Sequence, residues 1–289
     1  MSHMPERREA PRLSSPQSPI AMMHHSLPDE VTGSRQISRR GWNWWILRRI
    51  TWLLFLVFRG RKHGRLVLDR LRGVPLVVFP GVFHPGLFFS TPLLLDALDQ
   101  LELKMGSHVL DLGTGTGVCA IFAAKKGAQV TATDISPIAV RCARVNVVIN
   151  CLDDQVRVLE GDLFRPVRKK RFDLIIFNPP YYEGKPRTWY EYAWQGQKVL
   201  DRFAEGLGVH LAEGGRALIS VSTELDIAAV KEQLRENGFE LRERRRRRLP
   251  GETMFVYECI PSSASVPVRS EGLGTTMQRT WLPAQDLPQ

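Results

Sequence analysis

The sequence predicts an α/β fold: a mostly parallel sheet of seven strands, with an antiparallel C-terminal strand and helices on both faces. Short apolar runs alternate with segments whose apolar residues recur at helical spacing, which is typical of βα repeats. Glycine-rich or polar residues directly follow four of these runs. With 289 residues, 43% of them hydrophobic, the chain is long enough for one α/β domain with additional segments.

The N-terminal segment and the cysteine pattern together predict a cytoplasmic protein. Residues 1–38 combine Pro, Ser, Arg, His and Met without periodicity, so we expect them to be disordered. They lack the apolar stretch near the start that a signal peptide requires. The four cysteines form no CxxC pair, which indicates free thiols in a reducing compartment and no metal site. They are Cys119, Cys142, Cys151 and Cys259.

Residues 39–73 are predicted to form a basic, tryptophan-rich helix and a lead-in to the domain. The apolar stretch from Trp42 to Phe58 has Arg48 and Arg49 at its centre, and no acidic residue occurs between positions 39 and 65. Each central arginine would cost about 2.5 to 3.5 kcal/mol inside a bilayer, which disfavours a spanning helix. Two alternatives remain: a helix docked on protein, or a helix lying peripherally on the inner membrane surface.

The domain is predicted to extend over residues 74–260. A hairpin over 66–79, which turns at Arg72-Gly73, leads into it. Apolar residues at helical spacing then predict a helix over 91–103, with Pro92 in its first turn. We expect the amino end of this helix, near Thr91, to face a bound ligand.

A glycine-rich turn follows the first strand of the predicted parallel sheet. The strand over 108–112 contains Asp111, the turn reads Gly113-Thr114-Gly115-Thr116-Gly117, and a helix over 118–126 follows. Glycines at a strand-to-helix turn let the backbone approach a ligand closely. Alone, this pattern also occurs in dinucleotide-binding enzymes and in ordinary turns.

Acidic residues follow the next two strands. Asp134 ends the strand over 129–133, where a carboxylate can accept both hydroxyls of a ribose. It could instead cap the helix that runs to about residue 150, although Ser136 is also placed to do so. Asp162 follows the strand over 156–160 and could bond an adenine amino group while Leu163 covers the ring; the alternative is an ordinary turn residue.

The fourth strand, over 172–177, ends at Asn178-Pro179-Pro180-Tyr181. The prolines stop the strand, so Asn178 is expected at the carboxyl edge of the sheet, where α/β proteins bind ligands. The Asn178 side-chain oxygen and the Pro179 carbonyl could accept both N–H bonds of a planar NH2 group, with Tyr181 against its flat face. Such a pocket would act by positioning and electrostatics. The alternative is a strand that ends in a plain Pro-Pro turn.

Together these motifs resemble those of the class I S-adenosylmethionine (SAM)-dependent methyltransferases that methylate amino groups. Within this class the chain is similar to the HemK-type protein-glutamine N5-methyltransferases, which modify the Gly-Gly-Gln loop of translation release factors, and most of all to the compact archaeal and eukaryotic-type members. The likeness runs from about residue 77 to 260. It includes Phe83-His84-Pro85, residues 93–98, 111–117, 134–136, 161–163, 178–181, 193–196, 199–203 and 251–253.

The resemblance implies a Rossmann-like sheet, SAM as cofactor and a catalytic set of Asn178, Pro179 and Tyr181 that holds the target amide. It also implies, for some relatives, a small activator protein. An acidic residue expected near Thr91 is absent, and Gln197 stands where relatives have glycine. The residues expected to bind the cofactor are Thr91, Asp111, Gly113, Thr114, Gly115, Gly117, Asp134, Ile135, Asp162, Leu163 and Asn178.

The C-terminal part predicts the remaining sheet. Helices are expected over 199–211 and 226–237, a turn at Gly214-Gly215, and strands over 216–221, 239–249 and 253–260, the last two forming a hairpin. Six arginines, Arg242 and Arg244 to Arg248, fall on the first hairpin strand. They either protect the sheet edge or contact phosphates of RNA. Residues 261–289 are expected to form a disordered tail.

Two classes of function follow. In the first, the chain is an N-methyltransferase that acts on a protein glutamine of a release factor or ribosomal protein, with an adenine or guanine amino group of rRNA as the alternative acceptor. In the second, it is a non-catalytic module that binds SAM or RNA. The formal charge of +10 favours an anionic partner in either case. A DNA base-flipping enzyme is disfavoured because no large target-recognition insertion is present.

Overall fold

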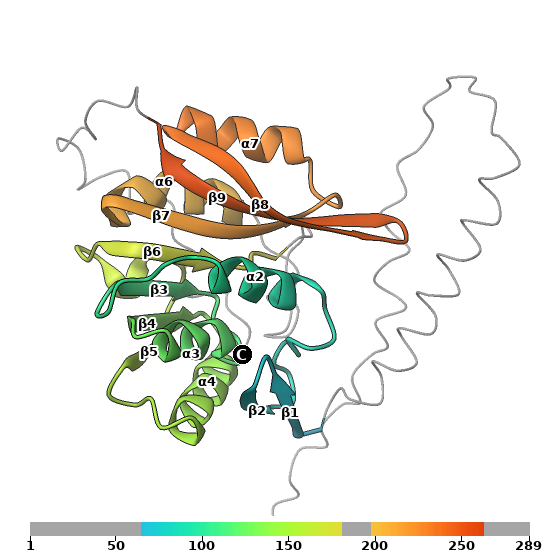
Figure 1. Ribbon diagram of the computed structural model, residues 1–289, viewed down its shortest axis with the longest axis vertical. Helices are drawn as coiled ribbons and strands as arrows, with labels where there is room; N and C mark the ends of the chain where they lie inside the picture. The colour runs from blue at the N-terminus through green and yellow to red at the C-terminus, as the bar shows by residue number, and fades with distance from the viewer. Residues whose placement is uncertain (1–64, 181–197, 263–289) are drawn as a thin grey trace, which may run out of the picture. The chain divides into compact units, whose positions relative to one another are not determined.

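The computed structural model describes residues 65–180 and 198–262, which contain a seven-stranded sheet in the order β5-β4-β3-β6-β7-β9-β8 (Figure 1). The strands are β3 (His108–Leu112), β4 (Gln129–Asp134), β5 (Val156–Glu160), β6 (Phe172–Phe177), β7 (Leu211–Ser222), β8 (Phe239–Leu249) and β9 (Glu252–Pro261). β3 to β7 are parallel, and β9 is antiparallel to both of its neighbours. The predicted fold class is confirmed.

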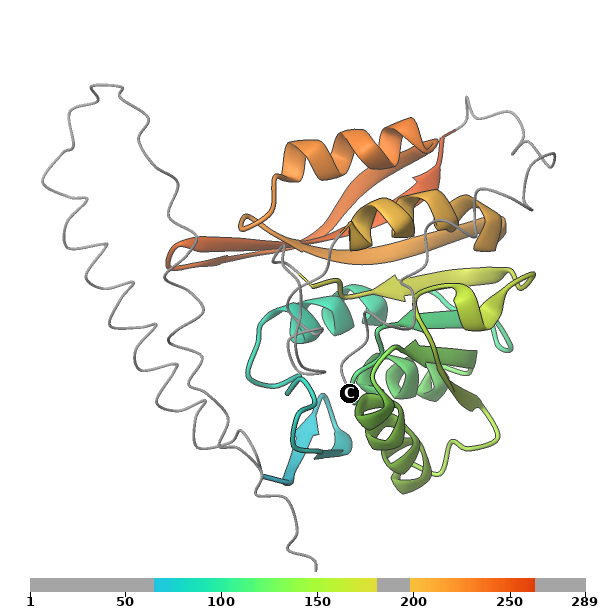
Figure 2. The same ribbon diagram turned by 180° about the vertical axis from the view of Figure 1, so that it is seen from behind.

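Helices cover both faces of this sheet. α2 (Ser90–Asp99), α3 (Val118–Lys125) and α4 (Pro137–Ile149) pack on one face, whereas α6 (Val199–His210) and α7 (Ile227–Glu236) pack on the other (Figures 1 and 2). Alternate strand residues supply the two cores: in β6, Leu174 and Ile176 face α2 and α3, while Ile175 and Phe177 face α6. This alternation explains why the central strands are apolar throughout.

A small hairpin, β1 (Val67–Leu71) and β2 (Val74–Val78), packs against α4. Its turn has the predicted residues, Arg72 and Gly73, both with positive φ. Asn146 of α4 is fully buried and fixes the hairpin, because its side chain accepts from the Val77 N–H and donates to the Val77 carbonyl. The same amide donates to the Thr116 carbonyl at 2.8 Å. One side chain therefore holds both the hairpin and the glycine-rich turn.

Two predicted boundaries differ from the structure. α2 ends at Asp99 rather than at residue 103. β7 begins at Leu211, so Gly214 and Gly215 lie within the strand and not in a separate turn. The pairing of β6 with β7 shifts register here: Phe172 pairs with Leu211 and Leu174 with Arg216, so residues 212–215, which include the glycine pair, form an irregular bulge opposite a single residue of β6.

Several predictions lie outside the described residues. They concern the disordered segment 1–38, the helix from Trp42 to Phe58, Tyr181 with residues 193–196, and the tail beyond Ser262. Among the residues that the structure describes, no helix is long and apolar enough to span a bilayer.

Candidate functional site

The predicted site residues gather at the carboxyl edge of the parallel strands. Asn178 directly follows β6, whose last residue, Phe177, pairs with Leu112 of β3 and with Ile219 of β7. The backbone after β6 therefore runs between the glycine-rich turn on one side and Ser220 on the other. This is the edge at which open α/β sheets bind ligands.

Three hydroxyl groups surround the half-buried side chain of Asn178. Its Nδ2 donates to Ser90 Oγ at 3.3 Å and to Thr91 Oγ1 at 3.5 Å. Its Oδ1 accepts from the Ser220 hydroxyl. All three hydroxyl-bearing residues are buried, so the amide is held from two helix residues and one strand residue. Thr91, predicted as a cofactor contact, thus also orients the predicted catalytic side chain.

The glycine-rich turn curls tightly between β3 and α3. Gly113, Gly115 and Gly117 all have positive φ, a conformation that other residues adopt at a cost. A Cβ atom added to Gly115 would meet no atom within 4 Å, whereas one added to Gly117 would approach Ala143 Cβ at 3.2 Å. Gly115 therefore faces open space, and Gly117 permits close packing of α3 on α4.

Asp111 supports this turn from below. Its buried carboxylate accepts from the Thr114 hydroxyl at 2.5 Å and from the Ala120 N–H at 3.1 Å. Burial raises the pKa of Asp111 to about 7, an effect that these two hydrogen bonds oppose and that the neighbouring Asp134 reinforces. The hydrogen bonds that Asp111 and Thr114 make therefore stabilise the glycine-rich turn itself.

Asp134 is half-buried at the end of β4 and joins the turn to the next helix. Its carboxylate accepts from the Gly115 N–H and from the Ser136 N–H, both at 2.9 Å. Burial raises its pKa, although backbone N–H groups, including that of Ile135, oppose this. The capping role falls to Ser136, whose hydroxyl accepts from the Ala139 N–H at 3.4 Å. Asp134 is therefore positioned beside the open space at Gly115 without being the helix cap.

The turn after β5 contains an ion pair that the sequence did not predict. Asp162 pairs with Arg202 of α6, and both side chains are largely buried. Leu163 adopts a positive φ of 43°, and its carbonyl accepts from the Thr133 hydroxyl at 3.5 Å. Any amino group that binds Asp162 would share its carboxylate with the guanidinium of Arg202.

Sequence reasoning missed Ser220, Arg202 and Asn146. Ser220 follows the apolar run 217–219 of β7, and Asn146 lies between two valines near the end of α4. A polar residue among apolar neighbours is a signal that buried hydrogen bonds are made. Arg202 carries no comparable signal, because arginine is common on exposed helix surfaces.

These features fit SAM. The open space beside Gly115 gives room next to backbone, and the Asp134 carboxylate could accept ribose hydroxyls. Ile135 and Leu163 are half-buried apolar residues that an adenine ring could contact. Thr91 and Asn178 lie at the other side of the glycine-rich turn.

Comparison with protein families matches residues 74–244 to the methyltransferase small domain. A curated relative, a putative protein N5-glutamine methyltransferase from Methanocaldococcus jannaschii, is 33% identical over 199 residues; the match covers 66% of this chain and 97% of the relative. A ribosomal RNA small subunit methyltransferase C from Alcanivorax borkumensis is 37% identical over 113 residues, but the match covers only 39% of this chain and 34% of that protein.

Two solved structures share the fold. The first belongs to the E. cuniculi Mtq2–Trm112 complex responsible for methylation of the eRF1 translation termination factor, with a TM-score of 0.50 and 27% identity over 63% of this chain and 99% of that chain. The second is the T. thermophilus 16S rRNA N2 G1207 methyltransferase in complex with AdoMet and guanosine. Its TM-score is 0.55, with 24% identity over 68% of this chain and 50% of that chain.

Proposed function

Because the chain belongs to the methyltransferase small domain family, we propose that its carboxyl-edge site methylates a planar NH2 group, most of all the side-chain amide of a protein glutamine. The chain is an SAM-dependent methyltransferase, and its resemblance to the glutamine-methylating members is confirmed by the relatives it matches. The acceptor and the roles of individual residues belong to the proposal.

One observation carries the proposal: a half-buried Asn178 at the sheet edge whose amide is oriented by Ser90, Thr91 and Ser220. A surface asparagine in a plain turn would not need three buried hydroxyl partners. The arrangement instead supports a side chain that must keep one orientation, as expected of a group that positions a substrate.

The reaction requires positioning rather than a strong base. An amide nitrogen is a poor nucleophile because its lone pair is delocalised over the carbonyl. SAM, when bound, supplies a methyl group on a positively charged sulfur. Asn178 Oδ1 and the Pro179 carbonyl would accept the two N–H bonds and so turn the nitrogen lone pair toward that methyl group. Since a carbonyl oxygen can accept two hydrogen bonds, the target would share Oδ1 with the Ser220 hydroxyl.

We assign Tyr181 to the flat face of the target on the strength of the motif alone, because it lies outside the described residues. For the cofactor, Asp134 would accept the ribose hydroxyls, and Gly113, Gly115 and Gly117 would let the backbone approach. The remaining contacts would come from Thr91, Asp111, Thr114, Ile135, Asp162, Leu163 and Asn178.

A protein glutamine is favoured as acceptor by the relative matched over nearly its whole length, which is a putative protein N5-glutamine methyltransferase. A release factor or a ribosomal protein would present such a side chain. The Mtq2–Trm112 likeness also supports a requirement for a small activator protein.

An adenine or guanine amino group in rRNA is the second candidate, supported by the partial match to a ribosomal RNA methyltransferase and by the net charge of +10. The pocket chemistry alone does not separate the two, because both acceptors are planar NH2 groups. A cytoplasmic location and a peripheral membrane contact through the stretch from Trp42 to Phe58 stay predictions from the sequence.

The test is methyl transfer from labelled SAM to separated fractions of release factors, ribosomal proteins, rRNA and DNA, with and without a small activator protein of the Trm112 type. We expect label in a protein fraction, on a glutamine side chain identified by mass spectrometry. Label on rRNA bases alone would establish the second candidate and contradict the first. No label in any fraction, with SAM binding intact, would support the non-catalytic module.

Asn178→Ala should lower the rate of transfer by at least about 100-fold while SAM binding is largely kept, because the acceptor loses its orienting oxygen whereas the cofactor loses only one of its many contacts. Asn237→Ala is the matched control, since this asparagine ends α7 on the surface. Equal rates in Asn178→Ala and wild type would remove the proposed mechanism.

A further inference from the structure

The arginine-rich strand β8 is the outer strand at one edge of the sheet. β9 is antiparallel to β7, and β8 is antiparallel to β9, so β8 runs in the same direction as the parallel strands. Its C-terminal half, which carries Arg244 to Arg248, therefore points toward the carboxyl edge. This is the edge at which Asn178 lies.

The register across the sheet places these arginines level with the site. Ser220 of β7, which hydrogen-bonds to Asn178, pairs with Val256 of β9, and Val256 pairs with Arg245 of β8. Three strand spacings separate β6 from β8, which is about 14 Å. Arg247 and Arg248 lie two and three residues further along, and so extend past the level of Asn178.

Carboxylates neutralise only part of this strand. Arg244 pairs with Glu258 at 2.6 Å, and Arg246 pairs with Glu243 at 2.7 Å. The Glu258 carboxylate is 2% exposed and also binds Arg216, so it offers no negative charge to the surface. Among the described residues, no carboxylate lies within ion-pair distance of the four others, Arg242, Arg245, Arg247 and Arg248.

Arg247 connects the strand physically to the site. Its guanidinium lies 4.2 Å from the ring centroid of Phe89, which is 42% exposed. Phe89 immediately precedes Ser90 and Thr91, the two residues of α2 that bind Asn178. An exposed aromatic ring with an arginine over it therefore borders the pocket.

We propose that the C-terminal half of β8, together with Phe89, forms a binding surface for single-stranded RNA. This surface extends toward the site around Asn178. Arg245 and Arg247, whose strand partners Val256 and Met254 both lie on the α2 side of the sheet, contact phosphates. Phe89 offers a ring on which a base stacks beside the Arg247 guanidinium. Unpaired arginines beside an exposed aromatic ring are the groups that single-stranded nucleic acid requires. The inference rests on the proposed function only in taking the carboxyl edge as the place of the acceptor.

Edge protection alone does not account for this arrangement. Charged side chains keep another strand from pairing with an edge, but this protection does not require a guanidinium over an exposed ring, as Arg247 has with Phe89. Within the described part of the chain, four arginines of this strand also lack a carboxylate partner. An acidic protein segment would neutralise the arginines of β8, but it would offer no base to stack on the ring of Phe89.

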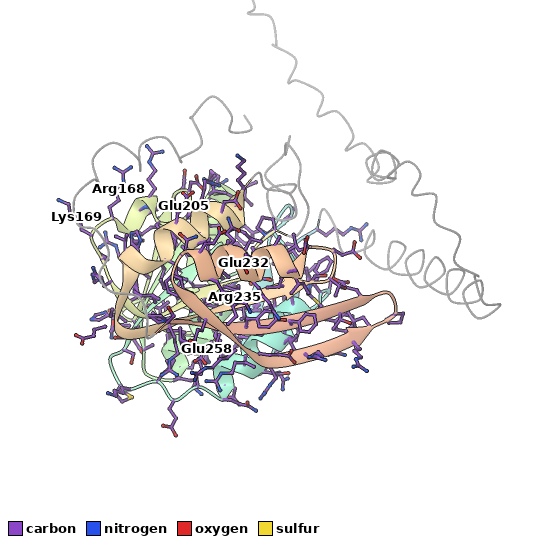
Figure 3. All side chains as sticks on the ribbon, turned by 90° about the horizontal axis from the view of Figure 1, so that it is seen from above. Arg168, Lys169, Glu205, Glu232, Arg235 and Glu258 are labelled. Atoms are coloured by element: carbon purple, nitrogen blue, oxygen red, sulfur yellow. The ribbon has the colours of Figure 1, made fainter. Side chains whose placement is uncertain are left out.

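The experiment measures binding of a fluorescently labelled, mixed-sequence single-stranded RNA of about 20 nucleotides by anisotropy at increasing KCl, without SAM. The test variant is Arg245→Gln/Arg247→Gln. The matched control, Arg168→Gln/Lys169→Gln, removes two positive charges from the loop before β6, at the opposite end of the sheet from the β8–β9 hairpin tip (Figure 3). Thermal melts verify that each variant is folded.

We expect the test variant to bind at least about tenfold more weakly than wild type, with a salt slope shallower by about 1.4, because two phosphate contacts are lost. The control should change affinity much less. Equal losses in both variants, or unchanged binding in the test variant, would overturn the proposal. So would duplex DNA or polyglutamate that competes as strongly as unlabelled RNA, the latter in favour of an acidic protein.

A second measurement avoids dependence on the variant's folding. Photo-crosslinking of the wild-type protein to 4-thiouridine RNA should give adducts at Phe89 or within 242–249, and adducts confined to other regions would contradict the inference. Asn178→Ala should bind RNA as wild type does. Loss of methyl transfer with RNA binding retained would therefore leave this inference standing, and the reverse result would remove it without affecting the proposed function.

Discussion

At the residue scale, the site depends on buried and half-buried polar groups that hydrogen-bond within the protein. Asn178 is held by three hydroxyls, Asp111 by a hydroxyl and a backbone N–H, and Asp134 by backbone N–H groups of two turns. Burial makes such hydrogen bonds costly to lose. The protein itself thus orients these described side chains, which suits a reaction that works by positioning.

The pKa of Asp111 gives the stability of the protein a pH dependence. Burial raises this pKa from 3.8 to about 7, so the folded state holds a proton that the unfolded state has lost between those values. The contribution of Asp111 to the free energy of unfolding is greatest below about pH 4 and falls as the pH rises to about 7. The whole decrease corresponds to about 4 kcal/mol. Asp111→Asn stays neutral, so it should gain stability relative to wild type over this range.

Chemical denaturation of both proteins at pH 4.5, 6 and 7.5 measures this difference. Taking the difference between the two proteins cancels the titration of groups that do not interact with Asp111; the neighbouring Asp134 does interact with it, so the difference reports the pair. A free-energy difference that stays constant from pH 4.5 to 7.5 would show that Asp111 ionises normally in the folded protein.

The clustering of the predicted site residues could be foreseen, because most of them lie at or just after strand ends, which meet at one edge of the sheet; Thr91, in α2, is the exception. The residues that hold these side chains in place could not be foreseen. Ser220 lies about 40 residues from Asn178 in sequence, and Arg202 lies 40 residues from Asp162. Only the register of β6 with β7, and the packing of α6 on the sheet, bring these pairs together.

At the element scale, the glycines of the site do different things. Gly117 begins α3 with a φ of 82°, and a Cβ there would lie 3.2 Å from Ala143 Cβ and 3.3 Å from its Cα. We expect Gly117→Ala to destabilise the protein by about 1–3 kcal/mol, from backbone strain and from separation of α3 and α4.

Gly214→Ala is the matched control for this substitution. Gly214 has a φ of 69° but is exposed in the β7 bulge, where an added Cβ meets nothing within 4 Å. It should therefore lose only the strain contribution, about 1 kcal/mol. Equal losses of unfolding free energy in the two variants would show that packing on Ala143 contributes nothing.

Across residues 65–180 and 198–262, one of the two side-chain helix caps was predicted. Ser136 caps α4, as the sequence indicated. Asp226, predicted as the first residue of a helix, instead caps α7 by accepting from the Ala228 and Ala229 N–H groups. The start of β7 was wrong because a Gly-Gly pair is typical of turns. Here Gly215 is required for another reason, since a Cβ would lie 2.8 Å from the Phe172 carbonyl.

At the scale of the whole molecule, the strand order follows from short connections and the expected right-handed crossovers. The arginine strand was predicted at the sheet edge and lies there. Its alignment with Asn178 could not be predicted, because this depends on the bulge between Glu243 and Arg245, which shifts the register of β8 against β9. A one-residue shift changes which face each arginine occupies.

Cofactor binding should stabilise the whole domain. A ligand at about 100 times its dissociation constant adds about 2.7 kcal/mol to the folded state, which for a domain of this size raises the melting temperature by about 5–10 °C. Differential scanning fluorimetry with SAM should show this shift in wild type and a much smaller one in Asp134→Ala, each measured against its own ligand-free melt. A full shift in Asp134→Ala would place the ribose elsewhere.

The buried amide of Asn146 has a mechanical consequence. It grips Val77 of the β1–β2 hairpin and Thr116 of the glycine-rich turn at the same time. A force that separates β2 from α4 must break the hydrogen bonds between Asn146 and Val77. If the Asn146 side chain instead moves with Val77, its hydrogen bond to Thr116 is lost. Displacement of the hairpin is thus coupled, through this one side chain, to the loop that would bind the methyl donor.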